Sequence, residues 1–276
     1  MTRRKKTQEM IDAAYGVLSE GHPMTVRQVY YQLVAAHIID NTRSRYQAVS
    51  NALVTARQAG EIPWEWIEDR MRKPRQVTMW EDLPDFISAV RRSYRRDVWA
   101  DQPHYVEAWL EKDALSGIFE DALSPYGVTL NVGRGFDGWD SIKNAADRFG
   151  YGSGSWDGAV LYFGDFDPSG EAMVHSLRER LAFFSCEPEI TKCALTFEDI
   201  SRYQLPPDFT KASDTRSKAF VEQWGDVAVE LDALPVGVLR DRLVSEVEAH
   251  MDLNALERTR SLEREDSVRL GRLLEE

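Results

Sequence analysis

Two hydrophobic patterns follow one another along the chain, and the change falls near residue 100. In the first part, apolar positions recur every three to four residues, which places them on one face of a helix. With the polar and glycine-containing segments between them, they predict helices over residues 7–20, 25–39 and 44–59. Residues 82–98 predict a further helix that links the first part to the second.

After residue 103, short apolar runs that are typical of strands alternate with helical segments. The strand-like runs are residues 104–110, 127–132, 158–164 and 187–195. This alternation predicts an α/β fold, a mostly parallel sheet with flanking helices. The tail, about residues 214–276, predicts charged helices without a separate core.

The pattern divides the chain into an N-terminal helical domain (1–80), a linking helix (81–102) and an α/β domain with a helical C-terminal extension (103–276). Three short helices followed by a compact aromatic and basic segment are typical of a winged-helix or helix-turn-helix module. Its third helix would contact DNA through exposed arginines: Arg43, Arg45 and Arg57. A generic three-helix scaffold is the alternative.

Charge is distributed unevenly along the 276 residues, which carry a net formal charge of −12. Residues 1–100 hold 16 of the 34 Lys and Arg and 12 of the 46 Asp and Glu, which leaves 18 basic and 34 acidic residues for 101–276. A basic front and an acidic back favour a DNA-facing module joined to a metal-binding or solubilising one. Ordinary solvated helix faces are the alternative.

The composition points to no membrane and no secretion. No apolar run approaches the roughly 18 residues of a membrane span, and "MTRRKKTQEM" lacks the apolar part of a signal peptide. The two cysteines, Cys186 and Cys193, form neither a disulfide framework nor a CxxC metal motif. We therefore expect a cytoplasmic protein.

Carboxylates directly follow two of the predicted strands. Glu111 follows the first strand, and Asp165 and Asp167 follow the third. Ligands of open α/β sheets bind at the carboxyl ends of the strands, and residues two apart in extended backbone point to the same side. Clustered carboxylates need a cation, and an all-oxygen set favours Mg²⁺, with Mn²⁺ as a substitute. We therefore expect metal-assisted phosphoryl chemistry here.

The predicted helix 25–39 carries two adjacent tyrosines, Tyr30 and Tyr31. At about 100° per residue, Tyr30 belongs to the apolar stripe, whereas Tyr31 lies roughly opposite its centre, one turn after Arg27, so we expect Tyr30 to pack and Tyr31 to be exposed. We expect the Arg27 guanidinium to favour the phenolate of Tyr31 and to hold a phosphate. A tyrosine that only stacks or hydrogen-bonds at a DNA or dimer surface is the alternative.

These motifs, in this order, resemble those of the topoisomerase VI A subunit and its relative, the meiotic double-strand-break transesterase. That family joins a winged-helix domain to a metal-binding toprim domain. The resemblance covers roughly residues 25–235 and is carried by "TVRQVYY" (25–31), "LEKDA" (110–114), "GRG" (133–135), "DFDPSG" (165–170) and, more loosely, "TFEDISRYQLP" (196–206).

The resemblance implies a toprim fold and DNA cleavage by transesterification. In that family a tyrosine attacks a DNA phosphodiester and stays linked to the 5′ phosphate, while toprim acids of the partner protomer hold Mg²⁺. Here Tyr31 would be the nucleophile beside Arg27, with Glu111, Asp165 and Asp167 as metal ligands. A symmetric homodimer that cuts both strands of double-stranded DNA is implied as well.

The chain also departs from the family pattern. Gln28 replaces the acidic residue that follows the motif arginine, and about 24 residues precede the motif. We expect the extension that engages the family's GHKL-type ATPase to be absent or minimal, although a separate ATPase or other subunit stays open as a partner. Arg134, between two glycines, could contact phosphate or lie in a plain turn.

Two other functions therefore stay open. Similar short proteins include the toprim nuclease of plasmid-defence systems, in which cleavage does not depend on the tyrosine. The chain could be such a hydrolytic nuclease, in which metal-bound water attacks and Tyr31 is a bystander. It could also be a non-catalytic DNA-binding subunit of a larger complex.

Overall fold

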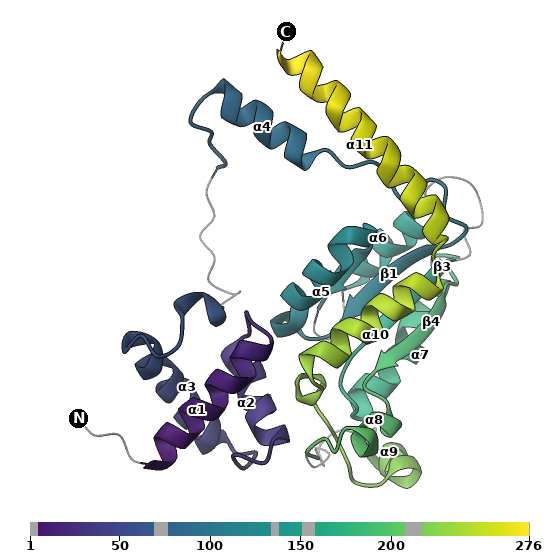
Figure 1. Ribbon diagram of the computed structural model, residues 1–276. Helices are drawn as coiled ribbons and strands as arrows, with labels where there is room; N and C mark the ends of the chain where they lie inside the picture. The colour runs from purple at the N-terminus through teal and green to yellow at the C-terminus, as the bar shows by residue number, and fades with distance from the viewer. Residues whose placement is uncertain (1–4, 69–76, 134–137, 151–157, 208–216, 276) are drawn as a thin grey trace.

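A computed structural model describes residues 5–68, 77–133, 138–150, 158–207 and 217–275. Figure 1 shows three N-terminal helices beside a helix-covered sheet, and a pair of helices that extends away from it. The chain is thus mixed α/β, as predicted.

The N-terminal helices are α1 (Lys5–Glu20), α2 (Val26–Ala35) and α3 (Arg43–Gln58). Thr25 caps α2: its hydroxyl accepts a hydrogen bond from Gln28 N at 3.3 Å, and Gln28 Oε1 accepts one from Thr25 N at 2.6 Å. This capping box satisfies backbone groups that a helix start leaves unpaired. The departure from the family pattern at position 28 therefore has a structural role.

The part of the domain that would hold a wing is only partly described. Within residues 5–68 and 77–80 there is no β-hairpin, and one isolated parallel bridge joins Met24 to Ile67. The short 3₁₀ helix η1 (Trp64–Trp66) precedes that bridge. The three helices agree with the sequence analysis, and the winged-helix assignment stays a prediction.

The sheet consists of β1 (Tyr105–Leu110), β2 (Thr129–Val132), β3 (Gly158–Phe163) and β4 (Glu189–Ala194), in the order β2-β1-β3-β4. All three pairings are parallel, which confirms the prediction. The two central strands, β1 and β3, are buried on both faces because helices cover the sheet on both sides, and their buried side chains are apolar except for Glu107 of β1.

On one face of the sheet lie α5 (Ser116–Leu123), which follows the 3₁₀ helix η3 (Asp113–Leu115), and α10 (Val236–Ala249). On the other lie α6 (Trp139–Gly150) and α7 (Pro168–Ala182). Successive residues of a strand point to opposite faces. The two faces therefore build two hydrophobic cores on one sheet.

A buried carboxylate lies inside the second of these cores. Glu107 of β1 is fully buried and accepts hydrogen bonds from Tyr105 Oη at 3.1 Å, Trp109 Nε1 at 2.9 Å and Asn131 Nδ2 at 2.6 Å. Arg148 of α6 pairs with it through Nε at 2.5 Å and Nη2 at 3.0 Å. This charge is fully paired, so Glu107 ties α6 to the sheet.

The linking helix is shorter than predicted. It is α4 (Leu83–Ser93), and it packs against α11 (Leu253–Glu275) to form the projecting pair in Figure 1, which we call the arm. Tyr94 Oη donates to Asp266 Oδ2 at 2.9 Å, and Arg96 Nη1 lies 2.7 Å from the same oxygen.

The remaining elements cover the end of the sheet that bears the candidate site: α8 (Phe197–Arg202), α9 (Ser217–Trp224) and the 3₁₀ helix η5 (Leu231–Ala233). The 3₁₀ helix η4 (Ser124–Tyr126) follows α5 directly.

Across the described segments, we find no helix with the length and apolar character that crossing a membrane requires.

Candidate active site

Glu111 and Asp165 meet at the carboxyl ends of the two central strands. Glu111 follows β1, and its Oε2 accepts a hydrogen bond from Asp165 N at 3.1 Å and from Tyr162 Oη at 3.2 Å. Gly164 lies between β3 and Asp165, and a Cβ there would stand 2.7 Å from Glu111 Oε2. The glycine therefore allows the two strand ends to approach this closely.

A lysine neutralises the buried aspartate. Lys112 Nζ lies 2.6 Å from Asp165 Oδ2 and also pairs with Glu230. The other carboxylate oxygen of Asp165 accepts from Leu231 N at 2.8 Å, and its carbonyl accepts from Lys192 Nζ at 2.9 Å. Burial raises the pKa of Asp165 to about 7, although Lys112 acts in the opposite direction.

Two further acids, Glu230 and Asp232, join this cluster to α2. Arg27 Nη2 lies 2.7 Å from Glu230 Oε2, and Arg27 Nε lies 3.3 Å from Asp232 Oδ2. The side chain of Asp232 is fully buried, and neither of its carboxylate oxygens has a hydrogen bond in the described part of the chain. Burial raises the pKa of Asp232.

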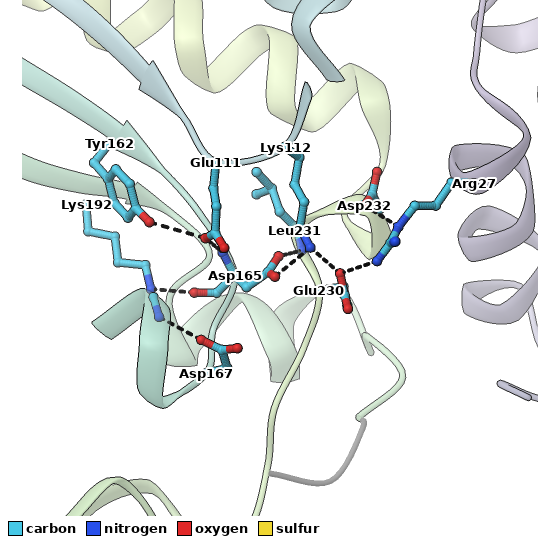
Figure 2. Close-up of polar contacts among 11 residues, drawn as sticks. Arg27, Glu111, Lys112, Tyr162, Asp165, Asp167, Lys192, Glu230, Leu231 and Asp232 are labelled. Atoms are coloured by element: carbon cyan, nitrogen blue, oxygen red, sulfur yellow. Dashed lines mark hydrogen bonds and ion pairs between the residues drawn. The ribbon is translucent and has the colours of Figure 1, made fainter. Parts of the chain in front are cut away.

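Figure 2 shows the resulting series of ion pairs, Arg27–Glu230–Lys112–Asp165, which crosses from α2 to the sheet. Packing supports it, because α2 lies against η5 and Gln32 Nε2 donates to the Leu234 carbonyl at 3.2 Å. The N-terminal helices therefore contact the edge of the sheet that carries the acids.

Sequence reasoning placed neither Glu230 nor Asp232 in the site. They lie far along the chain from the other acids, in a short turn without helical or strand periodicity. The only available signal was the spacing of two acids in "VELDAL" (229–234).

The two tyrosines have different environments: Tyr30 is buried, as the helical pattern predicts, but Tyr31 is half-buried against the core rather than exposed. Tyr30 is buried, and its hydroxyl donates to Asn41 Oδ1 at 2.9 Å and contacts the Thr42 carbonyl at 3.2 Å. Tyr31 is half-buried, and Arg27 Cζ lies 5.4 Å from the centre of its ring. Tyr31 is therefore the tyrosine that lies beside the charged series.

The expectation that Arg27 favours the phenolate is right in direction, because Arg27 lowers the pKa of Tyr31, but other influences outweigh it. Burial is the largest of them and the negative charge of Glu230 is the second, and the pKa of Tyr31 is raised to about 12.

Asp167, the third predicted ligand, caps a helix. It is the N-cap of α7, and its Oδ1 accepts a hydrogen bond from Gly170 N at 2.6 Å. Among the described residues, no three Asp, Glu, His or Cys side chains are grouped as metal ligands. The structure brings together Glu111 and Asp165 of the predicted set and assigns Asp167 to helix capping.

Glu111 and Asp165 nevertheless fit Mg²⁺ in ligand type and in charge. Both are carboxylates, the ligand type that Mg²⁺ prefers, and they lie close enough for Glu111 Oε2 to accept a hydrogen bond from Asp165 N. Asp165 is buried in a place where a cation, the Lys112 ammonium, already contacts it. These two residues would hold the ion, and Asp167 would join them through Oδ2, because its capping bond uses Oδ1.

The arginines predicted to contact DNA differ in their surroundings. Arg43 and Arg45 are exposed on α3, and Arg45 Nη2 lies 3.7 Å from Asp40 Oδ2. Arg57 instead donates from Nη2 to the Trp64 carbonyl at 2.7 Å and stacks on the Trp64 ring, with Cζ 4.2 Å from the ring centre. Arg134 lies outside the described residues.

The chain matches no protein-family model and no curated protein. Function is therefore inferred from the order of the motifs along the chain and from the geometry described above.

Proposed function

We propose that this chain cleaves double-stranded DNA in the manner of the topoisomerase VI A subunit, with Mg²⁺ held by Glu111 and Asp165 and with Tyr31 as the nucleophile. The observation that carries the proposal is the series Arg27–Glu230–Lys112–Asp165, which ties the tyrosine-bearing helix α2 to the acids at the edge of the sheet.

In the proposed reaction, Tyr31 Oη forms a bond to the phosphorus of a DNA phosphodiester and the bond from phosphorus to the 3′ oxygen breaks. The phenolic proton leaves to water, the departing 3′ oxygen takes up a proton, and nothing is oxidised or reduced. Bound Mg²⁺ would stabilise the negative charge that develops on the phosphoryl oxygens. Reversal of the same step reseals the strand.

Arg27 and Lys112 supply the positive charge on the protein side. Both contact Glu230, so an incoming phosphate would compete with this carboxylate for the two cations. A guanidinium released from Glu230 can hold a phosphate through two parallel hydrogen bonds. Moving Glu230 away would also lower the pKa of Tyr31, because the negative charge of Glu230 now raises it.

The domain assignments follow the same proposal. Residues 1–80 would be a winged-helix module that contacts DNA through the exposed Arg43 and Arg45 of α3. Residues 103–276 would be a toprim domain, a type of fold with which the four-stranded parallel sheet is consistent. The enzyme would act as a homodimer, since cutting both strands needs two tyrosines.

Hydrolytic cleavage is the second candidate, and one observation favours it. With its pKa raised to about 12, Tyr31 is protonated at neutral pH in the arrangement described here. An attacking water would need only the acids at the ends of β1 and β3. In that case Tyr31 would pack against Arg27 without reacting.

Nicking of supercoiled plasmid in Mg²⁺ or Mn²⁺ separates these functions. We expect the wild type to cut, Asp165→Ala to be inactive, and Tyr31→Phe to be inactive while Tyr30→Phe cuts. Cleavage by Tyr31→Phe would support hydrolysis instead. Salt-dependent DNA binding without cleavage in either metal, also with candidate partner subunits added, would contradict both and leave a non-catalytic subunit.

A further inference from the structure

One face of α3 is exposed along the whole helix and carries uncharged polar side chains along its centre. The opposite face packs on α1 and α2 through four apolar residues: Val49, Ala52, Leu53 and Ala56. At about 100° per residue, the exposed face aligns five residues that each bear an amide or a hydroxyl group: Ser44, Gln47, Asn51, Thr55 and Gln58. We call these five residues the polar stripe.

The charge around the polar stripe is complementary to a polyanion. Residues 41–60 contain three arginines and neither Asp nor Glu, although the whole chain has a net charge of −12. Arg43 and Arg45 are exposed beside the stripe at the start of α3. The nearest acid before the helix in the sequence, Asp40, already faces Arg45 at 3.7 Å. A nucleic acid therefore fits this face better than a basic protein surface does.

Two amides of the polar stripe hold each other in place. Gln47 Nε2 donates a hydrogen bond to Asn51 Oδ1 at 3.1 Å, as residues four apart on a helix can. Among the residues that the structure describes, neither side chain has a second hydrogen bond. Each amide thus retains an N–H and an acceptor lone pair for a ligand. Because the two side chains are already ordered, a ligand that binds both loses less conformational entropy.

The dimensions of α3 suit the major groove of DNA. Its 16 residues span about 24 Å, and the groove, about 12 Å wide, admits a helix. Gln47 and Asn51 lie about 6 Å apart along the helix axis, which corresponds to base pairs one or two steps apart. The amide of Asn or Gln binds adenine there, because its oxygen accepts from N6 while its N–H donates to N7.

We propose that the polar stripe reads A·T base pairs in the major groove, with Gln47 and Asn51 each bound to one adenine. The inference rests on the proposed function for its partner, double-stranded DNA, and adds a sequence preference and two specificity-determining residues. Arg43 and Arg45 contact phosphates, which adds affinity without selecting a sequence.

Selection from a random duplex library in EDTA tests this preference in the absence of cleavage. We expect the full-length wild type to enrich two A·T pairs, one or two steps apart, each about tenfold over G·C. Gln47→Ala and Asn51→Ala should each lose the preference at one of these pairs and still bind DNA. Both variants keep the fold, because alanine is a better helix former than either amide. Asn254→Ala, which removes an exposed asparagine of α11, is the matched control and should select the wild-type sites.

A change of specificity tests the assignment of Gln47 more sharply. Arginine binds guanine through O6 and N7, so Gln47→Arg should exchange one selected adenine for guanine and keep the other. A glutamine that only stabilises the helix cannot give this exchange. Arg43→Ala should instead weaken binding to all sequences alike and reduce the salt dependence of binding.

The outcomes separate this inference from the proposed function. Binding of all sequences with equal affinity by the wild type would overturn the inference and leave DNA cleavage open. A preference that Gln47→Ala, Asn51→Ala and Gln47→Arg all leave unchanged would do the same. A wild type that binds no duplex at all would overturn the inference together with the DNA partner of the proposed function.

Discussion

The guanidinium of Arg27 lies 2.7 Å from the carboxylate of Glu230, although the two residues are 203 positions apart. The same guanidinium faces the fully buried Asp232 at 3.3 Å. Arg27 of α2 therefore contacts two acids: Asp232, which lies in η5, and Glu230, the residue before η5. This contact joins the N-terminal helices to the α/β domain at the candidate active site.

The first prediction concerns the stability of that junction. Arg27→Ala should destabilise the protein by about 1–3 kcal/mol, because it removes one of the two cations, Arg27 and Lys112, that act on the buried Asp232. This loss of stability is smaller than the loss on breaking a fully buried ion pair, because the Arg27 side chain is 38% exposed and its charge is partly screened by solvent. Urea unfolding measures the difference.

Asp232→Leu combined with Arg27→Met is the matched comparison for that experiment. This double variant should recover most of the stability that Arg27→Ala loses, because no buried charge is left unpaired. A double variant less stable than Arg27→Ala would show that the pair itself stabilises the junction.

The second prediction concerns Lys112, whose side chain is 16% exposed. Its removal in Lys112→Ala leaves Asp165 and Glu230 without their shared cation. In EDTA we expect a loss of about 3 kcal/mol, or roughly 5–10 °C in Tm. Mg²⁺ should raise the Tm of Lys112→Ala by several degrees more than that of the wild type, because a divalent cation replaces the missing charge.

Differential scanning calorimetry with and without Mg²⁺ measures this difference. The wild type in both buffers is the first control, and Lys143→Ala, which removes an exposed lysine of α6, is the second. Equal effects of Mg²⁺ on all three proteins would contradict the assignment of the metal to Asp165.

The third prediction concerns pH and the pair formed by Asp199 and Arg242. Burial alone would raise the pKa of Asp199, but hydrogen bonds from Arg242 at 2.7 Å outweigh it and lower the pKa. A carboxylate with a lowered pKa in the folded state stabilises the protein above its unfolded pKa of about 3.9. That stabilisation is lost as the pH falls through the folded value.

Asp199→Asn should therefore be less stable than the wild type at pH 7, and the difference should shrink below pH 4. Asp241→Asn is the matched control, since Asp241 is exposed on α10, the helix that also carries Arg242. Unfolding by urea at several pH values gives the comparison. A constant difference across this range would contradict a role for the ionised pair.

Much of the α/β domain could be predicted from the sequence, for identifiable reasons. The run "GAVLYF" of β3 is apolar on both faces, which only a covered parallel strand requires. The meeting of Glu111 with Asp165 followed from the rule that parallel strands end at one edge of a sheet. Local pattern and topology were enough for both.

Asp167 shows where local pattern was read incompletely. Its backbone is extended, as we expected, but the helix α7 begins at Pro168, and Asp167 Oδ1 accepts a hydrogen bond from the first turn of that helix. An aspartate directly before proline is a common helix start, since its carboxylate accepts from the first turn. Its role as a metal ligand stays a prediction.

The raised pKa of Tyr31 could not be predicted at all. It depends on Glu230 and on the burial of α2 against η5, both of which arise from packing between distant parts of the chain. The helical wheel gives the direction of a side chain within its helix, and tertiary contacts decide what that side chain meets.

The central claim is that Tyr31 attacks DNA, and trapping a covalent adduct tests it most directly. The wild type is incubated with end-labelled duplex DNA and Mg²⁺, stopped with denaturant, and separated by electrophoresis beside Tyr30→Phe, Tyr31→Phe and Asp165→Ala. We predict a protein–DNA adduct for the wild type and for Tyr30→Phe, whose lost hydroxyl contacts Asn41 and Thr42. Tyr31→Phe and Asp165→Ala should give none. DNA cut equally well by Tyr31→Phe, with no adduct for any of the four proteins, would contradict the claim.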